Sequence, residues 1–232
     1  MCLSFFEQNK MTEKKINQGK CILVCAGEFV PIEIPVEQED YVIAVDGGFA
    51  YCRMLGIEPN LIIGDFDSVS DTDTAQLQQM EMDDADKVKR LRPEKDDTDT
   101  IAAVRIGLEK GYRKFFFYGA LGGRLDHSIA NIQTLLFLKK KGAVGYLLTH
   151  SNLITVIRNE EITFHRGVEG RLSLFSLGEC AKGVTIAGMK YSLENAVVTN
   201  DFPIGISNEF LPEQEGRVCV KEGELLIMVE WE

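Results

Sequence analysis

The chain has 232 residues, 45% of them hydrophobic, and a formal net charge of -11 at pH 7. This apolar content excludes a disordered chain and is sufficient for one large domain or two small ones, each with a core. The acidic balance argues against a nucleic-acid partner, because binding to a phosphate backbone calls for a basic face. A membrane partner is not expected either, because no apolar run approaches the roughly 20 residues that span a bilayer.

The N-terminal segment, residues 1–18, is mostly polar after Phe6 and lacks the long apolar core of a signal peptide. We interpret it as a loose leader and expect a cytoplasmic location. The six cysteines are scattered and form no CxxC pair, so a zinc site is not expected. Several of them lie inside apolar runs, which is typical of buried free thiols.

Strand and helix patterns alternate over residues 19–150. Short apolar runs predict strands at residues 20–26, 41–45, 61–63, 115–118 and 144–149, and alternation of polar and apolar residues predicts a strand at residues 87–91. Helical spacing and glycine stops predict a helix at residues 126–140 and another that ends near residue 110. Gly56 stops a short predicted helix at residues 49–55, and candidate N-caps at residues 71–73 predict a helix at residues 73–80. This alternation predicts a mostly parallel, Rossmann-like sheet covered by helices, that is, an α/β domain.

The pattern changes near residue 150. From residue 151 to residue 232, short apolar runs recur between glycines and other turn residues, and no long helical period is present. This pattern predicts an all-β sandwich or barrel of antiparallel strands as a second domain.

Four polar clusters each follow a predicted strand directly. In a parallel sheet, ligands bind beyond the carboxyl ends of the strands, so we expect these clusters to converge on one edge. They are Asp46-Gly47-Gly48, GDFDS at residues 64–68, KDDTD at residues 95–99 and GALGGR at residues 119–124.

The carboxylates of these clusters indicate a cation site. Asp65 and Asp67 are one residue apart and would project to the same side of an extended turn. Crowded carboxylates need a cation between them, and Mg²⁺ prefers oxygen ligands of this kind. Asp65, Asp67 and Asp99 are our first choices as ligands. The alternatives are an Asx-turn in GDFDS and, in KDDTD, a helix N-terminus capped by Thr98.

The glycine-rich cluster suits an anion. Gly122 and Gly123 allow backbone N–H groups to approach phosphate closely, and Arg124 can offer a bidentate fork to phosphate oxygens. Asp126 is a candidate to orient Arg124, to cap the following helix or to contact a substrate hydroxyl. A plain turn is the alternative for the glycines, and His127 is expected to have a capping or packing role.

Taken in order, these motifs resemble the thiamine pyrophosphokinase family. DGG at residues 46–48, GDFDS, KDxTD and GALGGRxDH at residues 119–127 carry the resemblance in the first half. GMKYSL at residues 188–193 and the pair Ser207-Asn208 carry it in the second half.

The resemblance implies transfer of the pyrophosphoryl group of ATP to the hydroxyethyl oxygen of thiamine, giving thiamine diphosphate and AMP. It implies Mg²⁺ held by Asp65, Asp67 and Asp99, with Arg124 and Asp126 also in the catalytic set. The expected nucleotide-binding residues are Asp46, Gly47, Gly48, Lys95, Asp96, Thr98, Gly122, Gly123 and Arg124. Ser207 and Asn208 match positions near thiamine. The domains implied are an ATP-binding catalytic domain over residues 19–150 and a thiamine-binding β-sandwich over residues 151–232, in a homodimer.

The sequence departs from the family pattern at Ile101, where an acidic residue is frequent. The aromatic residue that would stack on thiamine stays open among Tyr191, Phe210 and Trp231. Two other functions are compatible with the residues. A metal-dependent phosphoesterase would use the aspartates and Asp126-His127 to activate water, and a non-catalytic sensor would bind nucleotide or thiamine without turnover.

Overall fold

The computed structural model describes residues 6–7, 19–28, 30, 32–66, 71–91 and 97–231. The chain divides into two compact units. The first unit comprises residues 14–150, and the second comprises residues 151–232 together with residues 1–13. Within the described residues, no helix is both long enough and apolar enough to cross a membrane.

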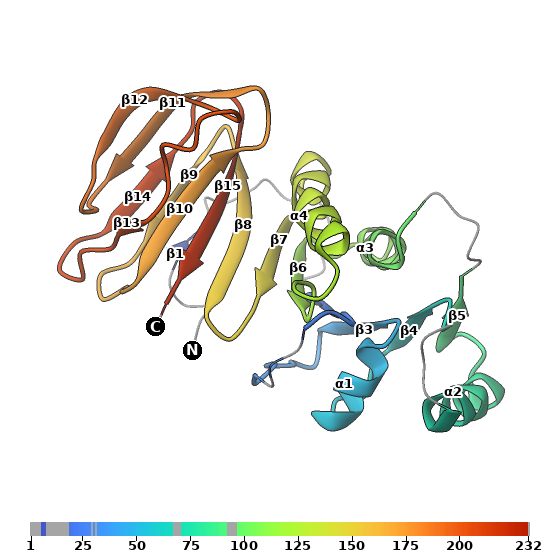
Figure 1. Ribbon diagram of the computed structural model, residues 1–232. Coiled ribbons are helices and arrows are strands. Elements are labelled where there is room, and N and C mark those ends of the chain that lie inside the picture. The colour runs from blue at the N-terminus through green and yellow to red at the C-terminus, as the bar shows by residue number, and fades with distance from the viewer. Residues whose placement is uncertain are drawn as a thin grey trace. The chain divides into compact units, whose positions relative to one another are not determined.

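The first unit is built on a parallel sheet with the strand order β7-β6-β2-β3-β4-β5 (Figure 1). Every neighbouring pair in this part of the sheet is parallel. Its strands are β2 (Cys21–Val24), β3 (Tyr41–Val45), β4 (Leu61–Gly64), β5 (Val88–Arg90), β6 (Lys114–Tyr118) and β7 (Val144–Leu148). They form where the sequence patterns predict strands.

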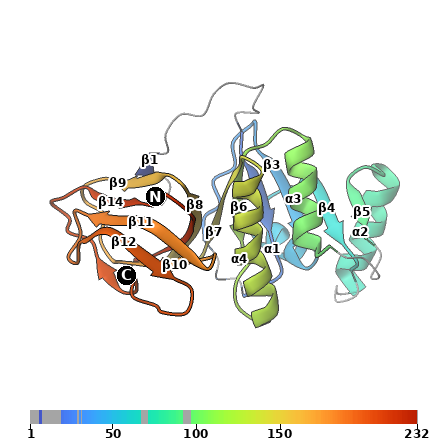
Figure 2. The same cartoon turned by 90° about the horizontal axis from the view of Figure 1, so that it is seen from above.

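Helices cover both faces of this sheet, with α3 and α4 on one face and α1 on the other (Figures 1 and 2). The helices are α1 (Gly48–Met54), α2 (Asp71–Asp83), α3 (Asp99–Glu109) and α4 (Leu125–Lys140). Because both faces are covered, β2 and β7 are buried at every residue, which explains their continuous apolar runs. The glycines that follow α1, α3 and α4 all have positive φ angles, as expected for helix stops: Gly56, Gly111 and Gly142.

The second unit is a β-sandwich. One sheet has the order β1-β9-β14-β11-β12, and the other contains β13, β10, β15 and β8 in that order. All the pairs in both sheets are antiparallel. The strands are β1 (Phe6–Glu7), β8 (Asn152–Arg158), β9 (Glu161–Phe164), β10 (Arg171–Ser176), β11 (Cys180–Ala187), β12 (Leu193–Thr199), β13 (Asn208–Glu209), β14 (Gly216–Cys219) and β15 (Glu224–Glu230).

Alternate residues of the two sheets meet in one core, where Leu172 and Ile227 of one sheet join Phe164, Val184 and Val218 of the other. The predicted fold class, a parallel α/β part followed by an antiparallel β-sandwich, is confirmed. Sandwich packing also decides between the two predicted all-β architectures.

One short strand lies within the predicted leader. Phe6 and Glu7 form β1, which pairs antiparallel with Phe164 and Thr163 of β9. The interpretation of residues 1–18 as a loose leader therefore does not hold for these two residues. A two-residue strand depends on backbone pairing with a distant edge, which leaves no hydrophobic period in the sequence.

Candidate active site

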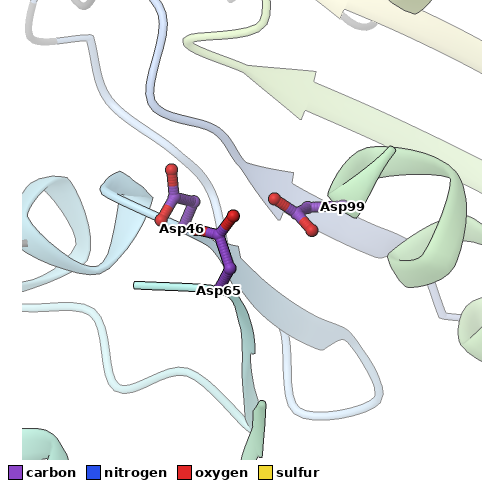
Figure 3. A group of neighbouring side chains, drawn as sticks. All are labelled: Asp46, Asp65 and Asp99. Carbon is purple, nitrogen blue, oxygen red and sulfur yellow. The ribbon is translucent and has the colours of Figure 1, made fainter. Parts of the chain in front are cut away.

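Three aspartates come together at the carboxyl end of the parallel sheet. Asp46 follows β3, Asp65 follows β4, and Asp99 is the first residue of α3. One carboxylate oxygen of each lies within 4.8 Å of the others, and all three residues are partly buried. Figure 3 shows their side chains gathered from three separate segments. The predicted convergence therefore holds for the loops after β3 and β4 and for the start of α3.

The pairing of β3 with β4 sets the separation of Asp46 and Asp65. The two strands are in parallel register, and the Asp46 N–H extends the pairing by donating to the Ile63 carbonyl at 2.7 Å. A Cβ atom on Gly64 would lie 3.0 Å from the Asp46 Cα, so a larger residue here would press on the Asp46 backbone.

The backbone at this edge adopts conformations that side chains disfavour. Asp46 has a φ angle of 52° and Phe66 a φ angle of 60°, both in the left-handed region. The extended turn expected between Asp65 and Asp67 is therefore absent at Phe66. Left-handed conformations of residues other than glycine persist only where the surroundings hold them, and they concentrate at functional sites.

The donor set fits a hard divalent cation. Three carboxylates this close repel one another unless a cation neutralises them, and carboxylate oxygens are ligands that Mg²⁺ accepts. Of the expected ligands, the structure brings Asp65 and Asp99 together, whereas Asp67 lies outside the described residues. Asp46, expected to contact the nucleotide, joins this carboxylate cluster. The sequence feature that indicates Asp46 is its position directly after β3, the strand that pairs with β4.

Arg124 and Asp126 form an ion pair rather than joining the carboxylate cluster. The Arg124 guanidinium donates to both Asp126 oxygens, at 2.6 and 3.2 Å, and both side chains are exposed. Hydrogen bonding from Arg124 lowers the pKa of the Asp126 carboxyl, and hydrogen bonding to Asp126 raises the pKa of the Arg124 guanidinium. Three roles are predicted for Asp126, and these hydrogen bonds agree with the first of them, the orientation of Arg124.

The glycine-rich loop is fixed by α4. The buried Asn131 side chain donates to the Ala120 carbonyl at 2.7 Å, and the Gly122 N–H donates to the Ser128 hydroxyl at 3.2 Å. The Gly122 N–H is therefore engaged within the protein. Gly123 has a φ angle of 65°, which favours glycine at this position. Ser128 and Asn131 are not among the predicted site residues, although both are polar residues in the first two turns of the helix that this loop opens.

Three of the remaining nucleotide-binding candidates have structural roles in the first unit. Thr98 caps α3, since its hydroxyl accepts from the Ile101 N–H at 3.3 Å. Gly48 packs so closely on β2 that a Cβ atom would lie 1.9 Å from the Val24 carbonyl oxygen. Gly47 lies between Asp46 and Gly48 as the N-cap of α1. Lys95 and Asp96 lie outside the described residues.

In the second unit, the two segments that carry the family resemblance, residues 188–193 and the pair Ser207-Asn208, lie side by side. The Asn208 amide oxygen accepts from the Tyr191 N–H at 3.0 Å, and its NH₂ group donates to the Tyr191 carbonyl at 2.7 Å. Ser207, with a φ angle of 56°, donates its N–H to the Ser173 hydroxyl. Asn208 is buried, so its amide links the two segments.

The three aromatic candidates differ in exposure. Phe210 is buried and packs edge-on against Phe164, whereas Trp231 packs partly buried on the core. Tyr191 is 58% exposed. A ring that stacks on a ligand needs a free face, which favours Tyr191 or Trp231 over Phe210.

Comparison with known proteins identifies the family. The model for "Thiamin pyrophosphokinase, catalytic domain" matches residues 33–146, and the model for "Thiamin pyrophosphokinase, vitamin B1 binding domain" matches residues 154–225. The thiamine pyrophosphokinase of Bacillus subtilis (strain 168) is 30% identical over 188 residues, covering 81% of this chain and 85% of the relative.

Solved structures agree with this assignment. The crystal structure of the Geobacillus thermodenitrificans thiamin pyrophosphokinase is 27% identical, with a TM-score of 0.80 over 93% of this chain and 98% of that one. The Bacillus subtilis crystal structure is also 27% identical, with a TM-score of 0.79 over 93% of this chain and 100% of that one. Both family models, the curated relative and the solved structures thus confirm the resemblance carried by the motifs, and the chain belongs to the thiamin pyrophosphokinase family.

Proposed function

We propose that this chain transfers the pyrophosphoryl group of ATP to the hydroxyethyl oxygen of thiamine in a Mg²⁺-dependent reaction that yields thiamine diphosphate and AMP. Membership of the family supports the reaction. The observation that carries the metal requirement is the carboxylate cluster of Asp46, Asp65 and Asp99 at the carboxyl end of the sheet.

The reaction forms a bond between the thiamine oxygen and the β-phosphorus of ATP and breaks the bond from that phosphorus to the oxygen that leaves with AMP. Such a transfer depends on charge neutralisation and in-line placement rather than on a covalent enzyme intermediate. Mg²⁺ bound to the carboxylate cluster would neutralise charge on the phosphates. Asp65 and Asp99 are the proposed ligands together with Asp46, and Asp67 remains a proposed fourth.

Arg124 is the proposed phosphate clamp, with its guanidinium held ready by Asp126. The lowered pKa of Asp126 makes this carboxylate a weak base, so we assign it the positioning of Arg124 rather than acceptance of the alcohol proton. Asp67 is the proposed proton acceptor. Gly47, Gly48, Lys95, Asp96, Thr98, Gly122 and Gly123 are the further proposed nucleotide-binding residues.

For thiamine, we propose direct contact with Ser207. The Asn208 side chain is engaged with the Tyr191 backbone, so its proposed part is to fix the segment that carries Tyr191. Among the aromatic candidates, the exposure of Tyr191 supports it as the ring nearest to a ligand.

We also propose a homodimer. Large exposed hydrophobic side chains recur between residues 191 and 206 of the second unit, and exposed apolar groups of this kind mark contact surfaces. They are Tyr191, Val197, Phe202, Ile204 and Ile206.

The proposed location is the cytoplasm. Supporting it, Cys21, Cys25 and Cys52 are buried free thiols, and burial raises the pKa of Cys25 and Cys52 to about 12. Buried thiols of this kind are typical of proteins in a reducing compartment.

A product assay with ATP, Mg²⁺ and thiamine tests the reaction. We expect AMP and thiamine diphosphate in equal amounts, with AMP appearing only when thiamine is present. ADP with thiamine monophosphate would show single phosphoryl transfer and overturn the mechanism. Phosphate release without thiamine would indicate a phosphoesterase, and binding without turnover would indicate a sensor.

A further inference from the structure

Phe66, the middle residue of GDFDS, lies in a contact that the reaction does not explain. The residue is 9% exposed, and its backbone has a left-handed conformation, which aromatic residues rarely adopt. The Arg90 guanidinium carbon lies 5.3 Å from the centre of the Phe66 ring, a distance at which a cation is attracted to the ring face. Phe66 directly follows Asp65 of the carboxylate cluster.

Arg90 reaches the ring from a fixed position. It is the last residue of β5, paired in register with Gly64 of β4, and the next N–H, from Leu91, donates to the Gly64 carbonyl at 2.9 Å. Its guanidinium also donates to Glu81 of α2, from both Nε and Nη2 at 3.3 Å. Two elements thus hold the cation against Phe66.

We propose that Arg90 is a positioning residue for the metal site: its contact with the Phe66 ring holds the left-handed turn after β4 and thereby keeps the Asp65 carboxylate in the carboxylate cluster. This role rests on the proposed metal site. Arg90 acts through Phe66, and Glu81 acts through Arg90.

A left-handed aromatic residue is strained, so the turn persists only while the surrounding contacts hold it. Loss of the cation on the ring lets Phe66 relax toward the ordinary β region, which redirects the chain next to Asp65. The three carboxylates then separate, and a cation shared among them binds more weakly.

The test is the affinity of the full-length protein for Mn²⁺ alone, read from the electron paramagnetic resonance signal of the free ion. We expect Arg90→Met to weaken binding about two- to fivefold, in line with one cation–ring contact. Arg90→Lys keeps a cation and should restore most of the affinity. Lys141→Met is the matched control, because it removes a cation that lies 5.6 Å from the Phe137 ring at the far end of α4.

A double-mutant cycle separates this role from general destabilisation. Phe66→Leu keeps an apolar side chain but removes the ring face, so its effect on Mn²⁺ affinity should not add to that of Arg90→Met. If Arg90→Met fails to fold, as judged from its thermal unfolding, Glu81→Gln provides a milder variant that should weaken Mn²⁺ binding in the same direction.

Several results would overturn the proposal. Unchanged Mn²⁺ affinity in Arg90→Met, or an equal loss in Lys141→Met, excludes a positioning role. A raised KM for ATP with unchanged Mn²⁺ affinity would show instead that Arg90 contacts the nucleotide. A wild-type protein that binds no Mn²⁺ would remove the metal site and this role together, whereas wild-type binding with an unaffected variant would remove this role alone.

Discussion

At the residue scale, the proposed metal site depends on an aspartate whose left-handed backbone conformation is more common for glycine and asparagine. Asp46 has a φ angle of 52°, and its carboxylate joins those of Asp65 and Asp99. Asparagine tolerates the left-handed region as well as aspartate does, so exchanging one for the other removes charge with little change to the backbone.

We therefore expect Asp46→Asn to fold normally and to lose at least about tenfold in kcat/KM, equivalent to about 1.4 kcal/mol of barrier. The Mg²⁺ concentration needed for half-maximal rate should rise, because one of three carboxylates is lost. Steady-state kinetics over a Mg²⁺ series measures both. Asp86→Asn, in an exposed turn before β5, is the control for the loss of one negative charge. If Asp46→Asn turns over near the wild-type rate, Asp46 is excluded from the metal site.

The ion pair of Arg124 with Asp126 gives a prediction about pH. Since hydrogen bonding from Arg124 lowers the Asp126 pKa below its ordinary value of 3.8, this carboxyl stays ionised as the pH falls to that value. The pair contributes at higher pH and is lost only as the pH falls through the lowered pKa. A carbon-detected NMR titration should place the Asp126 midpoint below the ordinary value, and Arg124→Gln should return it upward. A wild-type midpoint at the ordinary value would show that the pair does not persist in solution.

At the scale of single elements, α3 links stability to the site. Thr98 caps this helix, and the next residue, Asp99, brings a carboxylate to the cluster. The alternative interpretation of KDDTD as a capped helix start is therefore correct for Thr98. This interpretation is also compatible with a ligand role for Asp99, because the same turn caps the helix and brings the Asp99 carboxylate to the cluster.

Thr98→Ala should lower the free energy of unfolding of the first unit by about 1 kcal/mol, because the Ile101 N–H loses its acceptor. Urea unfolding followed by circular dichroism at helical wavelengths reports this unit, since the described helices all lie within it. Thr98→Ser keeps the hydroxyl and should retain most of the stability. Equal losses in the two variants would show that the methyl group, rather than the cap, is responsible.

At the scale of the whole molecule, each unit has its own architecture and core. The first unit is a parallel sheet between helices, and the second is a sandwich of two antiparallel sheets. The exposed side chains of residues 191–206 give the second unit apolar surface that its own core does not use.

If these side chains form the proposed dimer contact, Phe202→Glu combined with Ile204→Glu should yield a monomer, because two charges would be buried at an apolar interface. Light scattering after size-exclusion chromatography measures the mass. Met82→Glu is the control, since Met82 is 80% exposed on α2 of the first unit. A wild-type monomer, or a dimer that withstands both charges, would contradict the assignment of this surface.

Much of the fold was predictable because its signals are local. Apolar runs predict the strands from β2 to β7 except β5, which alternation of polar and apolar residues predicts, and glycine stops predict the ends of α1, α3 and α4. β1 and β13, which no apolar run marks, have two residues each and are defined by their partners. Such pairs leave no periodic pattern, so only the folded chain reveals them.

For the site, the amino-acid order alone was enough to indicate the chemistry, because acidic and glycine-rich clusters placed after parallel strands must meet at one edge of the sheet. The structure brings Asp46, Asp65 and Asp99 together and pairs Arg124 with Asp126, as this placement indicates, while the roles of these residues stay predictions. Only the tertiary structure showed that the Asn208 side chain bonds to the Tyr191 backbone and that Arg90 lies against the Phe66 ring. These contacts depend on strand register and left-handed turns, which arise from residues far apart in the chain and have no local signature in the sequence.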